Sequence, residues 1–157
     1  MKTFKYIVLG LVVILVAIQF IARPEKIEEP VTNDDIIVAL AVNVDMSKFL
    51  KGSCYDCHSN QPSYPWYFDY APMNWKIAEH IEDGRKHLNF SEWQSYTAKK
   101  QDHKLEEMIE EVESMEMPLA AYRTFHPEAN VSQEELDMLR LWILNERQKL
   151  SGSIENE

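Results

Sequence analysis

The sequence predicts an all-α protein in which one N-terminal transmembrane helix is followed by a single helical domain. Three observations support this fold class. The chain opens with a long apolar run, several later segments place apolar residues at the i, i+3, i+4, i+7 spacing of an amphipathic helix, and no two strand-like segments are joined by a turn. The length of 157 residues suits one modest domain after the apolar run.

The apolar run is expected to be an uncleaved membrane anchor within residues 1–22. From Tyr6 to Ala22 the side chains are apolar apart from Gln19. A helix of this length spans about 26 Å, close to the ~30 Å thickness of a hydrocarbon core. Two lysines precede the run, which favours a cytoplasmic N-terminus and a domain outside the cytoplasmic membrane, in the periplasm. No small-residue cleavage site follows the run.

The rest of the chain is strongly acidic. The whole sequence has a formal charge of −10 at pH 7, and its first 22 residues hold two of the 16 Lys and Arg residues and none of the 26 Asp and Glu residues, so residues 23–157 carry −12. Such a domain does not bind nucleic acid or anionic lipid headgroups through charge. The charge either keeps the domain soluble or steers it toward a basic redox partner.

The only two cysteines lie in the sequence Cys54-Tyr55-Asp56-Cys57-His58. This is C-x-x-C-H, the attachment motif of c-type haem. Two thiols at this spacing add to the two vinyl groups of one porphyrin, and the histidine that follows is placed to coordinate the iron. Two alternatives stay open. The cysteines could form a redox dithiol, although no βαβ setting surrounds them, or bind zinc with two of the histidines, which are His58, His80, His87, His103 and His126.

A tether and a helix are predicted to lead into this motif. Residues 23–31 contain two prolines and alternating charges, as is typical of a linker. The domain, residues 32–150, then begins with cap and acidic residues, followed by an apolar face from Ile36 to Phe49, and Gly52 is expected to end this helix. The β-branched run from 36 to 42 also fits a buried strand. In the helical interpretation, Cys54 lies in a turn directly after the helix.

An aromatic loop and a second helix follow the motif. Residues 60–72 hold three prolines, which exclude a regular helix, and five aromatic residues. These rings either wall the porphyrin or pack against the protein core. A helix from Pro72 to Gly84 is predicted next. It carries His80, a fallback ligand for the second axial position of the iron.

A basic island from Gly84 to Trp93 interrupts the acidic domain. Arg85 is a candidate for binding a haem propionate, with the indole N–H of Trp93 or the amide of Asn89 donating a hydrogen bond. The alternative is a solvated turn that leads into a helix capped by Ser91. Residues 99–114 are then predicted to form a polar helix with one apolar stripe.

Met117 is the candidate for the second axial ligand. Pro118 follows it directly and disfavours helical backbone at the preceding residue, so the methionine is expected on a loop that faces the iron. Histidine with methionine is a known axial pair in cytochromes c. Met115 is close enough to be confused with Met117, and methionines also serve simply as core residues. His126, in the loop after this segment, is a second fallback ligand.

The end of the domain is predicted to be a long helix. Ser132 and Glu135 form a capping box at its start, and Leu139, Trp142 and Ile143 fall on one apolar face. Residues 151–157 are expected to be a flexible tail.

With these residues identified, the chain resembles a family of small membrane-anchored bacterial proteins with a haem-binding domain. The resemblance covers nearly all of residues 32–147. It rests on the C-x-x-C-H-S-N sequence, the Y-P-W-Y loop, the G-R-x-x-L-N-F-S-E-W segment, the Met-Pro and His-Pro pairs, and the last helix with its tryptophan. It implies an all-helical, cytochrome c-like haem domain outside the cytoplasmic membrane. The chain also resembles class I cytochromes c in its order of elements, although the aromatic and G-R-x-x-L-N-F-S insert is unlike the smallest of these.

Three functions are compatible with these features. The first is an electron-transfer protein, not an enzyme, with haem c attached through Cys54 and Cys57 and iron held by His58 and Met117. Its expected partners are the haem c maturation machinery and a redox protein in or near the membrane. The second is a haem-based sensor or peroxidase-like enzyme with an open or displaceable distal position. The third is a module without haem in which the cysteines bind zinc or form a disulfide.

Overall fold

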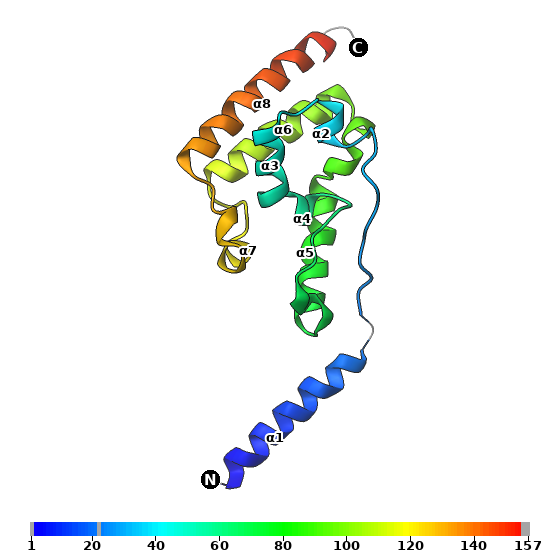
Figure 1. The fold of residues 1–157 in the computed structure, drawn as a ribbon, viewed down its shortest axis with the longest axis vertical. Coiled ribbons are helices and arrows are strands. Elements are labelled where there is room, and N and C mark those ends of the chain that lie inside the picture. Colours follow the sequence, from blue (N-terminus) through cyan, green and yellow to red (C-terminus); the bar gives the residue numbers. More distant parts are fainter. Residues whose placement is uncertain (1, 22, 155–157) are drawn as a thin grey trace.

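The computed structural model describes residues 2–21 and 23–154 of the chain, and over these residues it confirms the all-α fold, with no strand (Figure 1). The α-helices are α1 (Lys2–Ala17), α2 (Ile36–Ala39), α3 (Val44–Ser53), α4 (Tyr55–His58), α5 (Met73–His87), α6 (Ala98–Glu113), α7 (Ala120–Phe125) and α8 (Gln133–Ile154). The 3-10 helices are η1 (Ile18–Phe20), η2 (Trp66–Asp69), η3 (Phe90–Ser95) and η4 (Pro127–Ala129).

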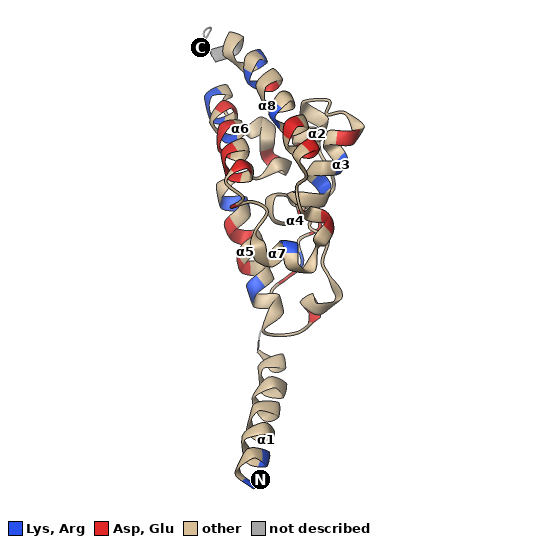
Figure 2. Ribbon diagram, turned by 90° about the vertical axis from the view of Figure 1, so that its left-hand side faces the viewer, with Lys and Arg blue, Asp and Glu red and all other residues tan. Residues whose placement is uncertain are grey.

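The N-terminal helix projects away from the domain. Lys2–Phe20 is long and apolar enough to cross a membrane, as an anchor or as a signal sequence, and none of it is buried against the protein. Figure 2 shows its charges confined to the N-terminal end, in contrast to the acidic residues spread over the domain. Residues 1 and 22 of the expected anchor lie outside the described residues.

The single helix expected from Thr32 to Gly52 is divided in the structure into α2 and α3. Ala41 adopts a left-handed conformation (φ 47°), which turns the chain between them. The side chain of Asn43 then accepts a hydrogen bond from the amide of Met46 (2.9 Å) and starts α3 as its N-cap. The helical interpretation of the β-branched run holds for α2. Gly52 does not end α3, which continues to Ser53 with Cys54 as its C-cap.

The core forms where α6 packs along α8. Leu105 and Leu139 are fully buried there, and Ile143 is nearly so; burial of each such side chain stabilises the fold by about 1.5–3 kcal/mol. The predicted capping box at the start of α8 is confirmed. The Ser132 amide donates to the Glu135 carboxylate (2.9 Å), and the Glu135 amide donates to the Ser132 hydroxyl (3.2 Å).

Two helix ends differ from the expectation. Helix α5 does not stop at Gly84 but runs to His87, and the side chain of Asn89, not Ser91, caps the following 3-10 helix by accepting from the Ser91 amide (3.1 Å). Helix α8 continues to Ile154, beyond the expected boundary at residue 150, and residues 155–157 lie outside the described residues.

Candidate functional site

A cavity of about 430 Å³ opens beside the C-x-x-C-H sequence. Residues from α3, α4, α5, α6 and the segment after α6 line it, so the fold brings together parts of the chain that are far apart in sequence. Its apolar lining includes Phe49, Leu88, Phe90, Met108, Val112 and Val131. A cavity of this size with mostly apolar walls is suited to a large hydrophobic ligand.

Cys54 and Cys57 both line this cavity as free thiols. Cys54 ends α3 and begins α4, and its carbonyl oxygen accepts hydrogen bonds from the amides of Cys57 (3.2 Å) and His58 (3.0 Å). This single turn places both sulfur atoms against one cavity. Burial raises the pKa of Cys54 to about 12, with a further rise from Cys57, and burial likewise raises the pKa of Cys57 to about 11, with a further rise from Asp56. The two groups are therefore protonated thiols at neutral pH.

His58 lines the same cavity in a fixed tautomer. Its Nδ1 lies 3.0 Å from the carbonyl oxygen of Leu88. Because a carbonyl can only accept, Nδ1 carries the proton and Nε2 keeps its lone pair for a metal. Burial lowers the pKa of His58, and hydrogen bonds to the carbonyls of Leu88 and Gly84 offset this only in part. The ring is thus held neutral, which is the form that binds iron.

Helix α5 approaches this turn more closely than a side chain allows. A Cβ at Gly84 would lie 2.6 Å from the carbonyl oxygen of Cys57 and 3.2 Å from its Cβ. The absence of a side chain therefore lets α5 pack directly against α4. Gly84 therefore allows α5 to pack closely against the motif at Cys57. It does not end α5, although its position in the sequence indicated that it would.

Met117 also lines the cavity, although it lies in the segment after α6, far along the sequence from the C-x-x-C-H motif. Met115 adopts a left-handed conformation (φ 62°) after α6, and the Met117 amide donates to the carbonyl oxygen of Glu111 (3.0 Å). This turn brings the partly buried Met117 to the cavity, whereas Met115 is 69% exposed and does not line it. Of the two methionines, only Met117 is placed at the site.

A profile of the haem-binding domain family matches residues 13–145, which is most of the chain. The chain belongs to this family. No curated protein and no solved structure matches it. Membership establishes haem as the group that this haem-binding domain takes up.

The cavity fits that group in three respects. Both thiols and the fixed imidazole of His58 line it, and the walls around them are apolar. The thioether of Met117 lines the same cavity and is a second possible ligand for the iron, after His58. Over the described residues, no group of three or more His, Cys, Asp and Glu side chains is placed to hold a metal ion.

The fallback ligands differ in whether they line the main cavity. His80, on α5, lines the main cavity and also a second cavity of about 120 Å³, which lies toward the aromatic loop. His126 lines the second cavity but is not among the residues that line the main one.

The two candidate propionate ligands lie outside the lining of the main cavity. Trp93 is 1% exposed within the core, and its indole Nε1 has no hydrogen-bond partner among the described residues. The Nε of Arg85 is also buried without a partner. Their contact with propionates stays a prediction. The cation that does line the cavity is Lys104, on α6, which pairs with Glu107. The helical pattern alone did not single it out, because that pattern predicts the charged residues of this helix to lie on a solvated outer face.

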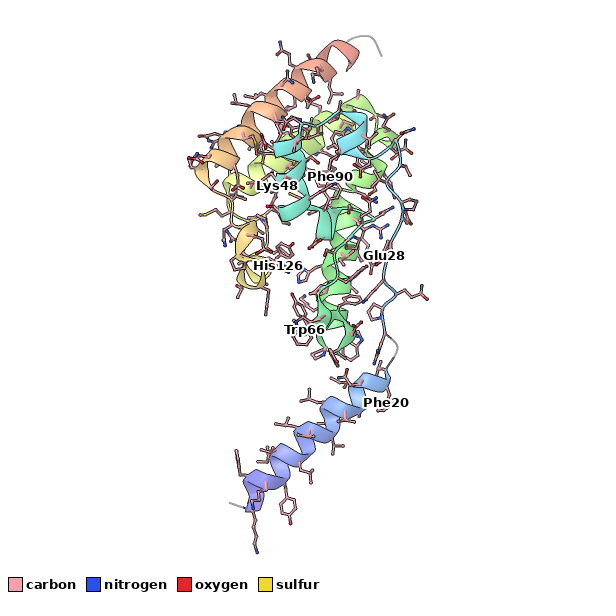
Figure 3. The ribbon with its side chains drawn as sticks, viewed as in Figure 1. Phe20, Glu28, Lys48, Trp66, Phe90 and His126 are labelled. Atoms are coloured by element: carbon pink, nitrogen blue, oxygen red, sulfur yellow. The ribbon has the colours of Figure 1, made fainter. Side chains whose placement is uncertain are left out.

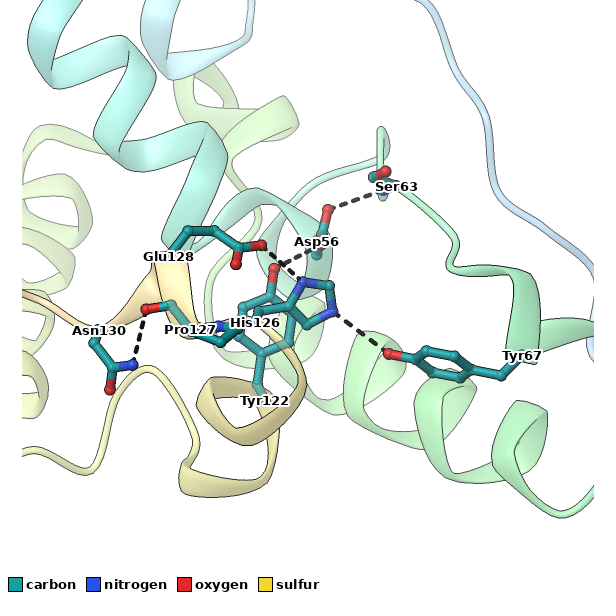
Figure 4. Close-up of polar contacts among 8 residues, drawn as sticks. All are labelled: Asp56, Ser63, Tyr67, Tyr122, His126, Pro127, Glu128 and Asn130. Atoms are coloured by element: carbon teal, nitrogen blue, oxygen red, sulfur yellow. Dashed lines mark hydrogen bonds and ion pairs between the residues drawn. The ribbon is translucent and has the colours of Figure 1, made fainter.

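A network of polar contacts borders the second cavity (Figure 4). The hydroxyl of Tyr122 donates to Asp56 (2.7 Å), the middle residue of the motif, and the ring of Tyr122 stacks on that of His126, with centroids 4.3 Å apart. His126 also lies 3.2 Å from Glu128 and 3.5 Å from the hydroxyl of Tyr67. These contacts tie α7 to the motif turn, so Asp56 is a positioning residue that the sequence did not reveal.

Proposed function

We propose that this chain is a c-type haem protein that carries one electron at a time, anchored in the cytoplasmic membrane with its domain in the periplasm. Cys54 and Cys57 would hold haem c covalently, and His58 and Met117 would bind its iron. When bound, the haem supplies an iron that is oxidised and reduced by one electron. The observation that carries the proposal is the convergence of these four side chains on one apolar cavity, with the tautomer of His58 fixed by Leu88.

The residues proposed to hold the haem come from two segments of the chain. Both cysteines and His58 come from a single turn, so they fix one side, and α5 supports that turn from behind through Gly84. Met117 approaches from the segment after α6. A thioether in this position raises the reduction potential relative to a second histidine. Two axial ligands leave no open position, which favours a carrier over an enzyme.

The partner of such a carrier is expected to present a basic surface. Asp83, Glu107 and Glu111 line the cavity, and acidic side chains continue along α5 and α6 (Figure 2). Charges of one sign around a reaction site raise the association rate with an oppositely charged partner, and salt screens the effect. Electron transfer from the reduced protein to a small basic redox protein should therefore slow steeply as ionic strength rises, and transfer to an acidic one should not.

The proposal is tested by staining for covalent haem. The full chain is co-expressed with a haem c maturation system, denatured and separated on a gel, and compared with the double variant Cys54→Ala/Cys57→Ala. Colour that survives denaturation in the native chain and is lost in the variant is the expected result. Folded native protein without colour would overturn the proposal and return attention to the dithiol alternative.

A second candidate function is a sensor or peroxidase-like enzyme. The observation that favours it is His80, which lines the same cavity as Met117 and offers a polar side chain beside the distal position. Carbon monoxide separates the two functions. It binds at once to an open distal position, whereas in the carrier it must first displace the methionine and binds slowly.

A further inference from the structure

The domain carries an exposed aromatic cluster, formed by Trp66, Tyr67, Tyr70 and Phe125. Trp66 is 77% exposed, Phe125 61% and Tyr70 56%. The rings are contiguous, since the centroid of Trp66 lies 5.7 Å from that of Tyr67 and 6.2 Å from that of Tyr70, and Tyr67 and Phe125 are 5.8 Å apart. Exposed aromatic groups of this extent mark a surface that something else covers.

This cluster lies beside the outer end of the N-terminal helix. The amide of Gln19 makes two hydrogen bonds to the backbone of Ala71, one to its carbonyl oxygen and one from its N–H, each 3.0 Å long. Figure 3 shows Trp66 at the end of the domain that faces Phe20, which is itself 87% exposed. The single polar residue within the apolar run is thus the one that joins the helix to the aromatic loop.

The segment predicted to be a linker contacts the domain along part of its length. The amide of Ile27 donates to the hydroxyl of Tyr64 (2.8 Å), and that of Glu29 donates to the carbonyl oxygen of Asn60 (3.0 Å). Lys26 forms an ion pair with Asp69 (3.2 Å), which is the last residue of η2. These contacts, made by Lys26, Ile27 and Glu29, hold the segment against the loop that carries Trp66 and Tyr70. Together with the hydrogen bonds of Gln19 to Ala71, they place this loop at the end of the N-terminal helix.

We propose that the aromatic cluster inserts into the headgroup region of the outer leaflet and fixes the orientation of the haem domain on the membrane. This inference rests on the membrane anchoring proposed above. If Lys2–Phe20 crosses the bilayer, Phe20 and Gln19 lie at its outer interface, and Trp66 and Tyr70 lie at the same level. Tryptophan and tyrosine favour this region because their rings are apolar and their N–H or O–H groups stay hydrated.

The bound surface is the zwitterionic interface and not anionic headgroups. The rings of the cluster contact one another, the hydroxyl of Tyr67 lies 3.5 Å from His126, and the nearby Lys26 is paired with Asp69. The domain as a whole is acidic and is repelled by anionic lipid. Binding should therefore not depend on the fraction of anionic lipid, unlike that of a polybasic membrane surface.

Trp66 supplies the test, because it is far more exposed than the partly buried Trp75 on α5 and the buried Trp93 and Trp142. The full chain with its haem is placed in nanodiscs of phosphatidylcholine, with and without bromine on the upper part of the acyl chains. Bromine should quench part of the tryptophan fluorescence of the native chain. That quenched part should disappear in Trp66→Phe, which keeps a ring in the cluster, and persist in the matched control Trp142→Phe.

A second variant tests the link to the helix. Gln19→Leu keeps the helix apolar but removes both hydrogen bonds to Ala71, so the chain should still enter nanodiscs while the quenching of Trp66 falls. Equal fluorescence of the native chain in brominated and plain nanodiscs would overturn the docking proposal and leave the electron-carrier function intact. Failure of the chain to enter nanodiscs would overturn the anchoring and docking together. The haem stain reports on the cofactor independently of both results.

Discussion

The two sides of the haem cavity are built differently. On the side of His58, the ligand turn is held from several directions, by the hydrogen bond to Leu88, by the close approach of α5 at Gly84, and by buried Ser59 and Asn60 next to it. On the side of Met117, a partly buried methionine lies on the segment after α6, beyond the left-handed residue Met115. In the function proposed above, the first side would be preorganised for one ligand geometry, whereas the second would be able to adjust or exchange its ligand. Whether the side of Met117 stays closed or opens distinguishes the two functions. An electron carrier would keep Met117 on the iron, whereas a sensor or peroxidase-like enzyme would release it to bind another ligand.

The largest effect is expected from a side chain added behind the ligand turn. Gly84→Ala places a Cβ 2.6 Å from the carbonyl oxygen of Cys57, and the overlap should destabilise the folded state by about 1–3 kcal/mol and lower the yield of attached haem. Urea unfolding and the haem stain measure the two quantities. Gly52→Ala is the matched control, since nothing lies within 4 Å of its new Cβ. It should stabilise α3 by up to about 1 kcal/mol. Similar behaviour of the two variants would contradict a preorganised ligand turn.

A loss of stability no larger than that of Gly84→Ala is expected when the loop that carries Leu88 is loosened. The buried amide of Asn89 donates to the side chain of Asn60 (2.9 Å), and its oxygen caps η3. Asn89→Ala leaves these partners without a hydrogen bond and should lower the free energy of unfolding by about 1–3 kcal/mol. It should also shift the reduction potential, because the carbonyl that orients His58 moves. An unchanged potential at reduced stability would show that this loop supports the fold only.

On the other side of the cavity, a substitution should change ligation with little change in haem attachment. Met117→Ala is expected to keep covalent haem at the native level and to bind carbon monoxide without the slow displacement step. Met115→Leu is the control, because that side chain points away from the cavity and should leave carbon monoxide binding unchanged. Slow binding in Met117→Ala would assign the distal position to another residue, with His80 the first candidate.

The smallest effect is expected far from the cavity, on the pair formed by Asp102 and Arg147. Two hydrogen bonds of 2.7 and 3.2 Å join them, and the hydrogen bond from Arg147 lowers the pKa of Asp102 below its usual value of 3.8. The stabilisation is therefore present above pH 3.8 and is lost as the pH falls through the lower folded-state pKa. Asp102→Asn should cost about 0.5–1 kcal/mol at pH 7. The difference from the native chain should vanish in acid, and haem ligation should not change.

Much of the architecture follows from local sequence. The apolar run, the spacing of apolar residues in α6, and the capping box of Ser132 and Glu135 each specify an element through short-range chemistry, and each is present in the structure. The same holds for the ligand turn, because C-x-x-C-H fixes its own spacing. These features need no knowledge of the rest of the chain.

What the sequence did not indicate depends on contacts between distant segments. The left-handed turn at Ala41 divides a segment that its cap residues and apolar spacing predict to be one helix, and the closeness of Gly84 to Cys57 exists only once α4 and α5 pack. The pairing of Tyr122 with Asp56, 66 residues apart, and of Gln19 with Ala71, 52 apart, is of the same kind. No local pattern encodes such pairs, since each partner alone has an ordinary residue type and neighbourhood.

X-ray absorption at the iron of the full-length protein tests the central claim most directly, with Met117→Ala as the comparison. We predict one sulfur ligand to the iron in the native chain, its loss in the variant, and an imidazole nitrogen from His58 in both. An iron in the native chain with no sulfur ligand would contradict the assignment of Met117 and, with it, the distinction between a fixed and an adjustable side of the cavity.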